Sequence, residues 1–410
     1  MYTILETFVG AGGSHLGFKR AGFKSVFVND IDKNFLKTLC HNNPDTEQSA
    51  IISNDDILNL DGHKILQQTN LKPGELDVMF GGIVCKGFSL AGERSPNDKR
   101  NYYYRKQLDL VSILRPKISV IENVPGILNA EILRYDVSDE IKEKVDCLWK
   151  KLENHKGQKA YYRKANKITE EFEEYGKNLR NEKEAFISEL KNTNNLISVR
   201  EDIELIYNEL GYKLQYKVLN SSWYGSCTKR DRVIFVAVRN DIKYDYEYPE
   251  KEYGEGTDKN LKTVFDALNL IDYSNKDDID NLPMNHAPKT VERFKYIGQG
   301  ENLAEKIDLL PDELKISKFY SRGSTMRLDG NKPSPTLVPG HSNFPIHPIE
   351  NRCITVREAA TITGFPIDYK FFGSHTKRCE QVGNAVPPDL AYAIAKNCVK
   401  LLNKFNNKEN

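Results

Sequence analysis

In the first third of the chain the hydrophobic positions fall into short runs, and each run ends at glycine or at polar residues. Residues 3–9 form the first run, and residues 14–21 after it have the spacing of an amphipathic helix. Further runs at 25–28, 76–80 and 116–121 are short enough for buried strands. Strands that alternate with helices predict an α/β fold, with a mostly parallel, Rossmann-like sheet and helices on both faces.

The pattern changes in a Lys/Glu-rich stretch from about 132 to 210. Apolar residues recur there every three or four positions, which predicts a helical insertion, and Gly157 marks the expected bend of a hairpin. The charges of this stretch are most simply a solvated face, and a partner or DNA surface is the alternative. Strands return at 214–219 and 232–238.

The chain beyond these strands divides into an irregular part and a patterned end. Residues 240–350 are rich in Tyr, Pro, Gly and Asn and have little periodicity, which predicts a second, smaller domain. Residues 355–363 have a helical pattern, and residues 390–402 predict a final amphipathic helix. We therefore expect a large domain at 1–238 that contains the insertion, a smaller domain at 239–375, and a segment at 376–410 that returns to the large domain.

Composition allows a large globular protein and limits its setting. The chain has 410 residues, of which 39% are hydrophobic and 29% are charged, enough for two or three domains. Its seven cysteines include no Cys-x-x-Cys pair, so we expect no metal and no disulfide framework, and a cytoplasmic location fits best. The first residues lack a basic signal-peptide region, and no apolar run reaches the ~20 residues that span a bilayer. Because the net charge is only +1, any polyanion must be bound by a local basic cleft.

Cys85 lies in a glycine-containing loop soon after the strand at 76–80. Open α/β sheets bind ligands at the carboxyl ends of their strands, so a thiol there can act as a nucleophile if a neighbour such as Lys86 favours the thiolate. The alternative is a small buried apolar residue. Glu122 follows the strand at 116–121 at the same edge, where a carboxyl group can donate a proton or can simply cap the next segment.

Polar residues at other strand ends suit a nucleotide-type cofactor. The glycine turn at 10–13 would let a ligand approach the backbone, and the helix behind it aims amide groups at the same place. Asp30, after the second strand, can accept hydrogen bonds from ribose hydroxyls, with Ile31 flat against an adenine, and Asp56 offers a further carboxylate. A plain tight turn and solvated strand ends are the alternative.

Two arginines supply a third group of candidates. Arg230 and Arg232 lie two residues apart, so in an extended segment both side chains face the same side and suit an anion or a carbonyl oxygen. None of the three groups decides the function by itself, and their order along the chain carries more information.

In that order the chain resembles the DNA cytosine-5 methyltransferases over nearly its whole length, apart from the insertion. The segments that carry the resemblance are Phe8-Val9-Gly10-Ala11-Gly12-Gly13, Asn29-Asp30-Ile31-Asp32, Asp56-Ile57, Cys85 followed by Gly87-Phe88-Ser89, Glu122-Asn123-Val124, Arg230-x-Arg232, Pro333-Ser334-Pro335-Thr336-Leu337, Thr355-Val356-Arg357-Glu358 and Gly383-Asn384-Ala385-Val386-Pro387-Pro388. The resemblance implies a catalytic and cofactor-binding domain at 1–238 and a target-recognition domain at 239–375, with double-stranded DNA in the cleft between them.

The resemblance also implies a chemistry. The Cys85 thiolate would add to C6 of a cytosine flipped out of the duplex, and C5 would then receive the methyl group of S-adenosylmethionine. Glu122 would hydrogen-bond N3 and the 4-amino group, Arg232 would hold the cytosine O2 and Glu122, and Arg230 would support the active-site loop. The polar loop from Lys86 to Tyr104 would close as a lid.

Two binding sites follow from the same motifs. S-Adenosylmethionine is expected to contact Phe8, Gly10, Gly12, Gly13, Asp30, Ile31, Asp56, Ile57, Asn384 and Ala385. DNA is expected to contact Lys86, Ser89, Arg327 and Thr336. The chain departs from the family where Val84 and Lys86 stand in place of Pro and Gln around the nucleophile, and where Cys227-Thr228 stands in place of Pro-Gln before the arginines.

Two alternatives stay open on the sequence. One is a catalytically weak protein that binds S-adenosylmethionine and DNA, which the departures alone support, and the other is an enzyme that acts on RNA, as one branch of the family does. The long region at 240–350, the size of a DNA target-recognition domain, favours DNA. We expect a monomer without membrane association, nucleoid-associated in a prokaryote or phage, that works alone or beside a restriction endonuclease.

Overall fold

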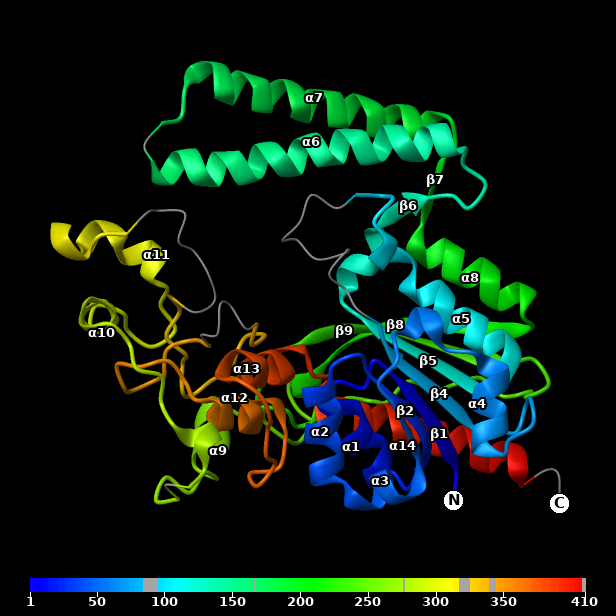
Figure 1. The fold of residues 1–410 in the computed structure, drawn as a ribbon. Helices are drawn as coiled ribbons and strands as arrows, with labels where there is room; N and C mark the ends of the chain where they lie inside the picture. The colour runs from blue at the N-terminus through cyan, green and yellow to red at the C-terminus, as the bar shows by residue number, and fades with distance from the viewer. Residues whose placement is uncertain (84–94, 166, 276, 317–324, 339–343, 408–410) are drawn as a thin grey trace.

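Figure 1 shows the computed structural model, which describes residues 1–83, 95–165, 167–275, 277–316, 325–338 and 344–407. Three residues that the sequence assigns to the site, Cys85, Lys86 and Ser89, lie outside the described residues, as does the first part of the predicted lid. Their roles therefore stay predictions.

The described residues form a seven-stranded sheet in the order β3-β2-β1-β4-β5-β9-β8. Its strands are β1 (Thr3–Thr7), β2 (Lys24–Asn29), β3 (Ile51–Ser53), β4 (Val78–Gly82), β5 (Ile118–Asn123), β8 (Tyr212–Asn220) and β9 (Asp231–Arg239). Strands β1 to β5 run parallel, and the antiparallel pair β8 and β9 joins the sheet beside β5. The predicted α/β fold with a mostly parallel sheet is confirmed, and the five parallel strands end at the same edge.

Helices cover both faces of this sheet, because successive strand residues point to opposite sides. Leu5 belongs to one core and its neighbour Ile4 to the other. The first core includes residues of α4 (Gly62–Thr69), α5 (Tyr103–Leu114) and α8 (Val199–Glu209), and the second includes residues of α1 (Gly13–Arg20) and α14 (Pro388–Asn406). Two further helices, α2 (Lys33–Asn42) and α3 (Pro44–Ser49), connect β2 to β3.

The C-terminal helix α14 packs directly on α1, as Figure 1 also shows. A Cβ on Gly17 would lie 2.5 Å from the Cβ of Ala391, and a Cβ on Gly13 would lie 2.2 Å from the carbonyl oxygen of Val386. Glycine at both positions therefore allows an approach that no larger residue would permit. The end of the chain thus completes one face of the sheet that the first strand begins.

Between β5 and β8 the chain leaves the sheet as a long helical hairpin (Figure 1). Helices α6 (Asp139–Lys164) and α7 (Glu170–Asn192) pack through their own apolar cluster, above a short ribbon of β6 (Glu131–Leu133) and β7 (Leu196–Ser198). The predicted bend near Gly157 is wrong, because this residue lies inside α6, where a glycine costs only ~1 kcal/mol. Thr169 instead caps the start of α7 with its side chain.

Two other boundaries differ from the sequence predictions. The insertion does not extend to 210, because Ile203 and Tyr207 of α8 are buried in the core beneath the sheet. The predicted loop also ends earlier than Tyr104: a 3₁₀ helix, η2, covers Lys99–Tyr102, and α5 follows it directly. Tyr104 is fully buried and its hydroxyl donates to Asp202 of α8, so tertiary burial turns an apparently polar segment into helix.

The remaining residues form a smaller lobe with few regular elements. Its α-helices are α9 (Val264–Leu268), α10 (Pro288–Phe294), α11 (Leu303–Lys306), α12 (Val356–Thr363) and α13 (His375–Asn384), and its 3₁₀ helices are η5 (Ile279–Asn281), η6 (Ile307–Leu309) and η7 (Asp312–Leu314). Three other 3₁₀ helices lie between elements of the sheet domain: η1 (Ile57–Asn59), η3 (Pro125–Asn129) and η4 (Ser221–Tyr224). The predicted helix at 355–363 starts with a capping box between Thr355 and Glu358. Across the described residues, no helix combines the length and the apolar character needed to cross a membrane.

Candidate active site

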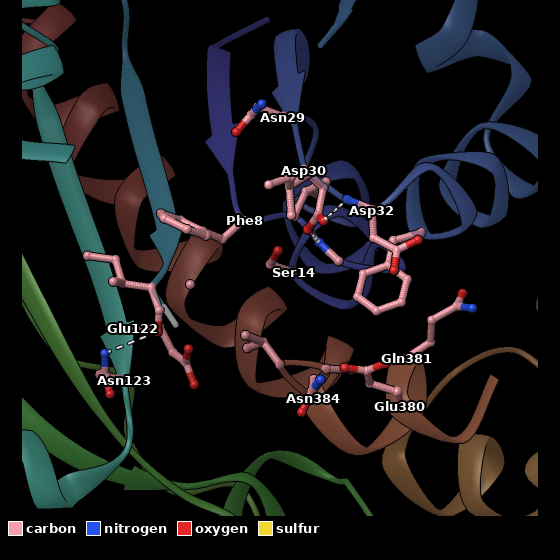
Figure 2. A pocket seen from close by; sticks show the side chains of 18 of the residues that line it. Phe8, Ser14, Asn29, Asp30, Asp32, Glu122, Asn123, Glu380, Gln381 and Asn384 are labelled. Atoms are coloured by element: carbon pink, nitrogen blue, oxygen red, sulfur yellow. Dashed lines mark hydrogen bonds between the residues drawn. The ribbon is translucent and has the colours of Figure 1, made fainter. Parts of the chain in front are cut away.

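A cavity of about 390 Å³ lies at the carboxyl ends of the parallel strands. Figure 2 shows that the side chains around it come from the first strands, from β5 and from α13. Eleven of the residues that the sequence assigns to cofactor binding or catalysis line this one cavity: Phe8, Gly10, Asp30, Ile31, Asp56, Ile57, Asn384, Ala385, Glu122, Arg230 and Arg232.

The turn after β1 places a ring and a backbone amide at the cavity. Phe8 and Gly10 both have left-handed backbone conformations, with φ of 52° and 58°. The Gly10 N–H donates to Asp30 Oδ2 at 2.8 Å, and the Phe8 ring lies 6.3 Å from the ring of Tyr103 in a stacked arrangement. The turn therefore fixes Phe8 and Asp30 relative to each other before any ligand binds.

Gly12 and Gly13, which the sequence assigns to the same site, do not line the cavity. A Cβ on Gly12 would lie 2.9 Å from the Tyr369 hydroxyl, and Gly13 faces the carbonyl of Val386. These glycines let α1 approach the smaller lobe and the C-terminal segment, so they support the turn by packing.

Asp30 is preorganised by two backbone amides. Its Oδ2 accepts from Gly10 and its Oδ1 accepts from the Asp32 N–H at 2.9 Å. Burial raises the pKa of Asp30, and these two hydrogen bonds act in the opposite direction. Ile31 beside it lines the cavity and is 65% exposed, so its apolar side chain is free to contact a ligand.

Asp56 and Ile57 reach the cavity from the end of β3. The Asp56 carboxylate accepts from the Leu58 N–H at 2.9 Å and caps η1, and the Ile57 side chain is buried. The carboxylate is therefore held by its own helical turn, which leaves it at the edge of the cavity.

Glu122 and Arg232 form a buried ion pair at the catalytic end. Arg232 Nε lies 2.6 Å from Glu122 Oε1, and each side chain is 9% exposed. Gly82 lies opposite Glu122 in the neighbouring strand, and a Cβ there would be 3.5 Å from Glu122 Oε2. Arg230 is buried as well, and its Nη1 donates to the Gly383 carbonyl at 2.7 Å. The arginines thus have different tasks: one binds the carboxylate and the other ties the loop before β9 to α13.

The segment that departs from the family pattern is tied to the smaller lobe. The Cys227 N–H donates to the Ile362 carbonyl, and the Thr228 hydroxyl donates to the Pro335 carbonyl at 3.1 Å. Burial raises the pKa of Cys227 to about 12, so this thiol stays protonated and is no rival nucleophile. The Thr336 hydroxyl donates to the Lys229 carbonyl at 3.0 Å, and its predicted DNA contact stays a prediction.

Arg327 has a different role from the DNA contact that the sequence predicts. Its side chain is buried, and all five of its N–H groups have protein acceptors. These acceptors are the carbonyls of Ile297, His347, Glu350 and Phe294 and the side-chain oxygen of Asn351. No donor is left for a phosphate or a base, so Arg327 holds loops of the smaller lobe together.

The site residues assigned from the sequence make up only part of the cavity wall. The further lining residues are Val9, Ser14, Asn29, Asp32, Phe35, Gly82, Ile83, Tyr103, Asn123, Val124, Lys377, Glu380, Gln381 and Val386. Six of these belong to the motifs that carry the family resemblance, although no role is assigned to them there: Val9, Asn29, Asp32, Asn123, Val124 and Val386. Lys377, Glu380 and Gln381 share a helix with Asn384 at helical spacing, and only this spacing hints that they face the same way.

Sequence comparisons find relatives over nearly the whole chain. A family model described as C-5 cytosine-specific DNA methylase matches residues 2–148 and 187–400. Type II methyltransferase M.Eco47II of Escherichia coli is 28% identical over 421 residues, which cover 100% of this chain and 81% of that protein. Type II methyltransferase M1.HphI of Haemophilus parahaemolyticus is 27% identical, with 97% of this chain and 87% of that protein covered.

Solved structures with a similar fold include proteins of low sequence identity. A protein described as a DNA modification methyltransferase encoded within an E. coli prophage superimposes with a TM-score of 0.62 at 23% identity, covering 98% of this chain and 100% of that chain. The Dnmt2 methyltransferase of S. pombe gives a TM-score of 0.56 at 12% identity, covering 98% and 99%. At these identities the likeness concerns the fold.

Proposed function

The chain belongs to the C-5 cytosine-specific DNA methylase family, and on that premise we propose how its residues divide the reaction. The family model matches both sides of the hairpin, from the first strand to the final helix. The protein is therefore a DNA (cytosine-5)-methyltransferase, and the family and fold imply S-adenosylmethionine as the methyl donor.

The cavity at the strand ends suits S-adenosylmethionine in size and in chemistry. Its volume of about 390 Å³ is typical of small-molecule sites, and Phe8, Ile31 and Phe35 offer apolar surface for a purine ring. The carboxylates of Asp30 and Asp56 can accept hydrogen bonds from ribose hydroxyls or from an ammonium group. We infer that the eight predicted residues that line the cavity bind this ligand, and that Gly12 and Gly13 support them.

The reaction needs an attack on C6, because C5 of cytosine is a poor nucleophile. We propose that Cys85 Sγ bonds to C6 while Glu122 hydrogen-bonds N3 and the 4-amino group, which shifts electrons toward C5. S-Adenosylmethionine, when bound, supplies the methyl group that C5 receives. Loss of the C5 proton then expels the Cys85 thiolate and restores the double bond between C5 and C6.

The buried ion pair between Glu122 and Arg232 is the observation that carries this assignment. A carboxylate and a guanidinium are costly to bury unless they are well paired, so their presence in a cavity favours a role in chemistry over a role in stability. We propose that Arg232 also binds the cytosine O2. Arg230, through its bond to Gly383, would hold the loop that presents Arg232.

We propose that Lys86 contacts a DNA phosphate, because a flexible lysine in a loop is more often solvated or bound to a backbone than held against a neighbouring sulfur. Ser89 and Thr336 would bind the DNA from the two sides of the cleft, and the predicted target-recognition domain at 239–375 would read the target sequence. The base must leave the stacked duplex to expose C6, and we propose that the loop that begins at residue 86 and ends before η2 closes over it.

The curated relatives are Type II methyltransferases, which supports a place as the modification enzyme of a Type II restriction-modification system. In such a system a separate restriction endonuclease reads the same DNA sequence, so no stable complex with it is needed. We propose a monomer, because one chain supplies both the cavity and the smaller lobe.

A covalent trap tests the mechanism. Bisulfite sequencing of DNA from cells that express the protein would first identify the target site. DNA with 5-fluorocytosine at that site should then form a covalent complex with the protein, because fluorine at C5 cannot leave as a proton does. Cys85→Ser should abolish this complex and leave DNA binding largely intact. If a verified site gives no covalent species with the wild-type protein, the proposed role of Cys85 is wrong.

A further inference from the structure

Helix α13 forms a wall of the methyl-donor cavity although it lies far from the first strands in sequence. Lys377, Glu380, Gln381 and Asn384 of this helix line the cavity. Figure 2 shows Glu380, Gln381 and Asn384 on the side away from Asp30. The width of the cavity therefore depends on what holds α13 against the turn that follows β2.

Lys377 makes that connection. Its Nζ lies 2.8 Å from Asp32 Oδ2 and 3.0 Å from Glu380 Oε2, and it lies 5.5 Å from the centre of the Phe35 ring. Asp32 and Phe35 belong to the N-terminal end of α2, and both line the cavity. One ammonium group thus contacts side chains from both walls.

Asp32 passes this restraint to the proposed ribose acceptor. While its Oδ2 accepts from Lys377, its Oδ1 accepts from the Asn34 N–H and caps α2. The backbone N–H of the same residue donates to Asp30 Oδ1 at 2.9 Å. A shift of Asp32 would therefore move Asp30 and the intervening Ile31. Burial raises the pKa of Asp30, and the positive charge of Lys377 acts in the opposite direction.

The opposite side of α13 is anchored separately. Arg378, the next residue, donates from Nη1 to Asp280 Oδ1 at 2.7 Å and to the Ile279 carbonyl at 3.0 Å. Asp280 is almost fully buried in the smaller lobe. Lys377 therefore links the start of α2 to α13, and the smaller lobe fixes the position of α13 through Arg378.

We propose that Lys377 is a positioning residue for the methyl donor, which holds Asp32 and Asp30 in the arrangement that binds the adenosyl part of S-adenosylmethionine. The inference rests on the proposed function, in which this ligand occupies the cavity. It assigns to Lys377 an effect on the methyl donor and none on the DNA or on the chemical step.

Lys377→Gln tests this role by its split between binding and turnover. The dissociation constant and the KM for S-adenosylmethionine should rise about fivefold, as for loss of a partly exposed ion pair, while kcat at saturating donor and the KM for DNA stay unchanged. Lys377→Arg should restore most of the affinity, because it keeps the charge. Lys404→Gln is the matched control, since Lys404 forms an ion pair of the same length with Glu247 on the surface of α14.

A second experiment tests whether Lys377 acts on Asp30 through Asp32. Asp32→Asn alone should weaken donor binding, and adding Lys377→Gln to it should have little further effect, because both changes remove the same contact. Thermal melting of each variant shows whether it is folded. If calorimetry gives Lys377→Gln the affinity of the wild-type protein, the inference is overturned and the proposed function stands. If the wild-type protein itself does not bind S-adenosylmethionine, the proposed site fails and the inference with it.

Discussion

The cavity edge and the helical hairpin use charged residues in opposite ways. At the cavity, Glu122 and Arg232 bind each other at 2.6 Å with side chains 9% exposed. On the hairpin, Lys144 and Glu140 pair at 2.9 Å with side chains 60% and 77% exposed. Burial makes the loss of either partner costly in the first pair, whereas water screens the second. The same kind of contact fixes geometry in one region and only keeps a surface solvated in the other.

The two regions also differ in how they are joined to the sheet. The cavity is built from residues at the ends of the central strands, so a change in the positions of these strands would change its shape. The hairpin has a separate apolar cluster and stands on the ribbon of β6 and β7. The family model stops at 148 and resumes at 187, which leaves out the far part of the hairpin. We therefore expect substitutions in the cavity to change activity and donor binding strongly, and substitutions in the hairpin to change them little.

The largest effect is expected at Glu122. Glu122→Gln keeps the shape of the side chain but removes the charge that pairs with Arg232 and the group that acts on N3. The kcat should fall by roughly 10²- to 10⁴-fold, while the affinity for S-adenosylmethionine changes little. Transfer of a labelled methyl group at saturating donor measures the first quantity and calorimetry the second. A loss of kcat below tenfold would mean that Glu122 does not act on the cytosine ring.

A pair of glycines compares the packing between α1 and α14, which covers the sheet, with the packing of the hairpin. Gly17→Val would force a side chain into Ala391 of α14 and should cost about 1–3 kcal/mol of unfolding free energy. Gly157→Ala on α6 meets nothing within 4 Å and should stabilise the hairpin by about 0.5–1 kcal/mol. Urea unfolding of both variants measures the contrast. Equal effects would contradict the view that the hairpin tolerates change.

Asp30 links donor binding to pH. Burial raises its pKa above the ordinary value of 3.8, so as the pH falls Asp30 takes up a proton earlier than an exposed aspartate would. If the ionised form binds the ribose, donor affinity falls at a correspondingly higher pH. Folding stability should not decline with it through this residue, because a raised folded pKa means that the folded state binds the proton more readily.

Asp30→Asn separates this effect from the rest of the protein. It should weaken donor binding at neutral pH by about tenfold and should remove the acid-side loss of affinity. Calorimetric titrations of S-adenosylmethionine across the pH range would check both. A variant that keeps the wild-type pH profile would show that another group titrates.

The smallest effect is expected from shortening the hairpin. Replacing residues 153–181 by a short Gly/Ser linker removes its far part and leaves the β6–β7 ribbon in place. The affinity for S-adenosylmethionine and the kcat should change by less than about twofold, because none of the described residues between 153 and 181 lines the cavity. A large rise in the KM for DNA would instead show that the hairpin contacts the duplex, the alternative that its many lysines suggest.

Sequence patterns predicted the fold and much of the cavity because both depend on local signals. A short apolar run and the glycine or acid that follows it mark a strand and its carboxyl end, and these signals place Gly10, Asp30 and Glu122 at one edge of the sheet. The helix at 355–363 was predicted for the same reason, since its capping residues are neighbours in sequence. Phe8 is assigned to the cavity only through the resemblance to the family.

The errors arise where a residue's role is set by distant contacts. Arg327 looks like any surface cation until five backbone and side-chain oxygens surround it. Lys377 binds Asp32 across 345 positions of sequence, and no local pattern announces that pair. The hairpin bend was misplaced because a glycine weakens a helix by less than the packing of α6 on α7 restores.

The contact between α1 and α14 also imposes an order of events during synthesis. Arg20 of α1 binds Asp389 of α14 across 369 positions, which at a typical ribosomal pace of ~5–20 residues per second is a delay of roughly 20–70 s. Until α14 is synthesised, Phe18 and Phe80, which pack in the same core as α14, lack the apolar residues of that helix that help to shield them from water. The nascent chain should therefore depend on chaperones that shield this apolar face, and it should aggregate when they are scarce.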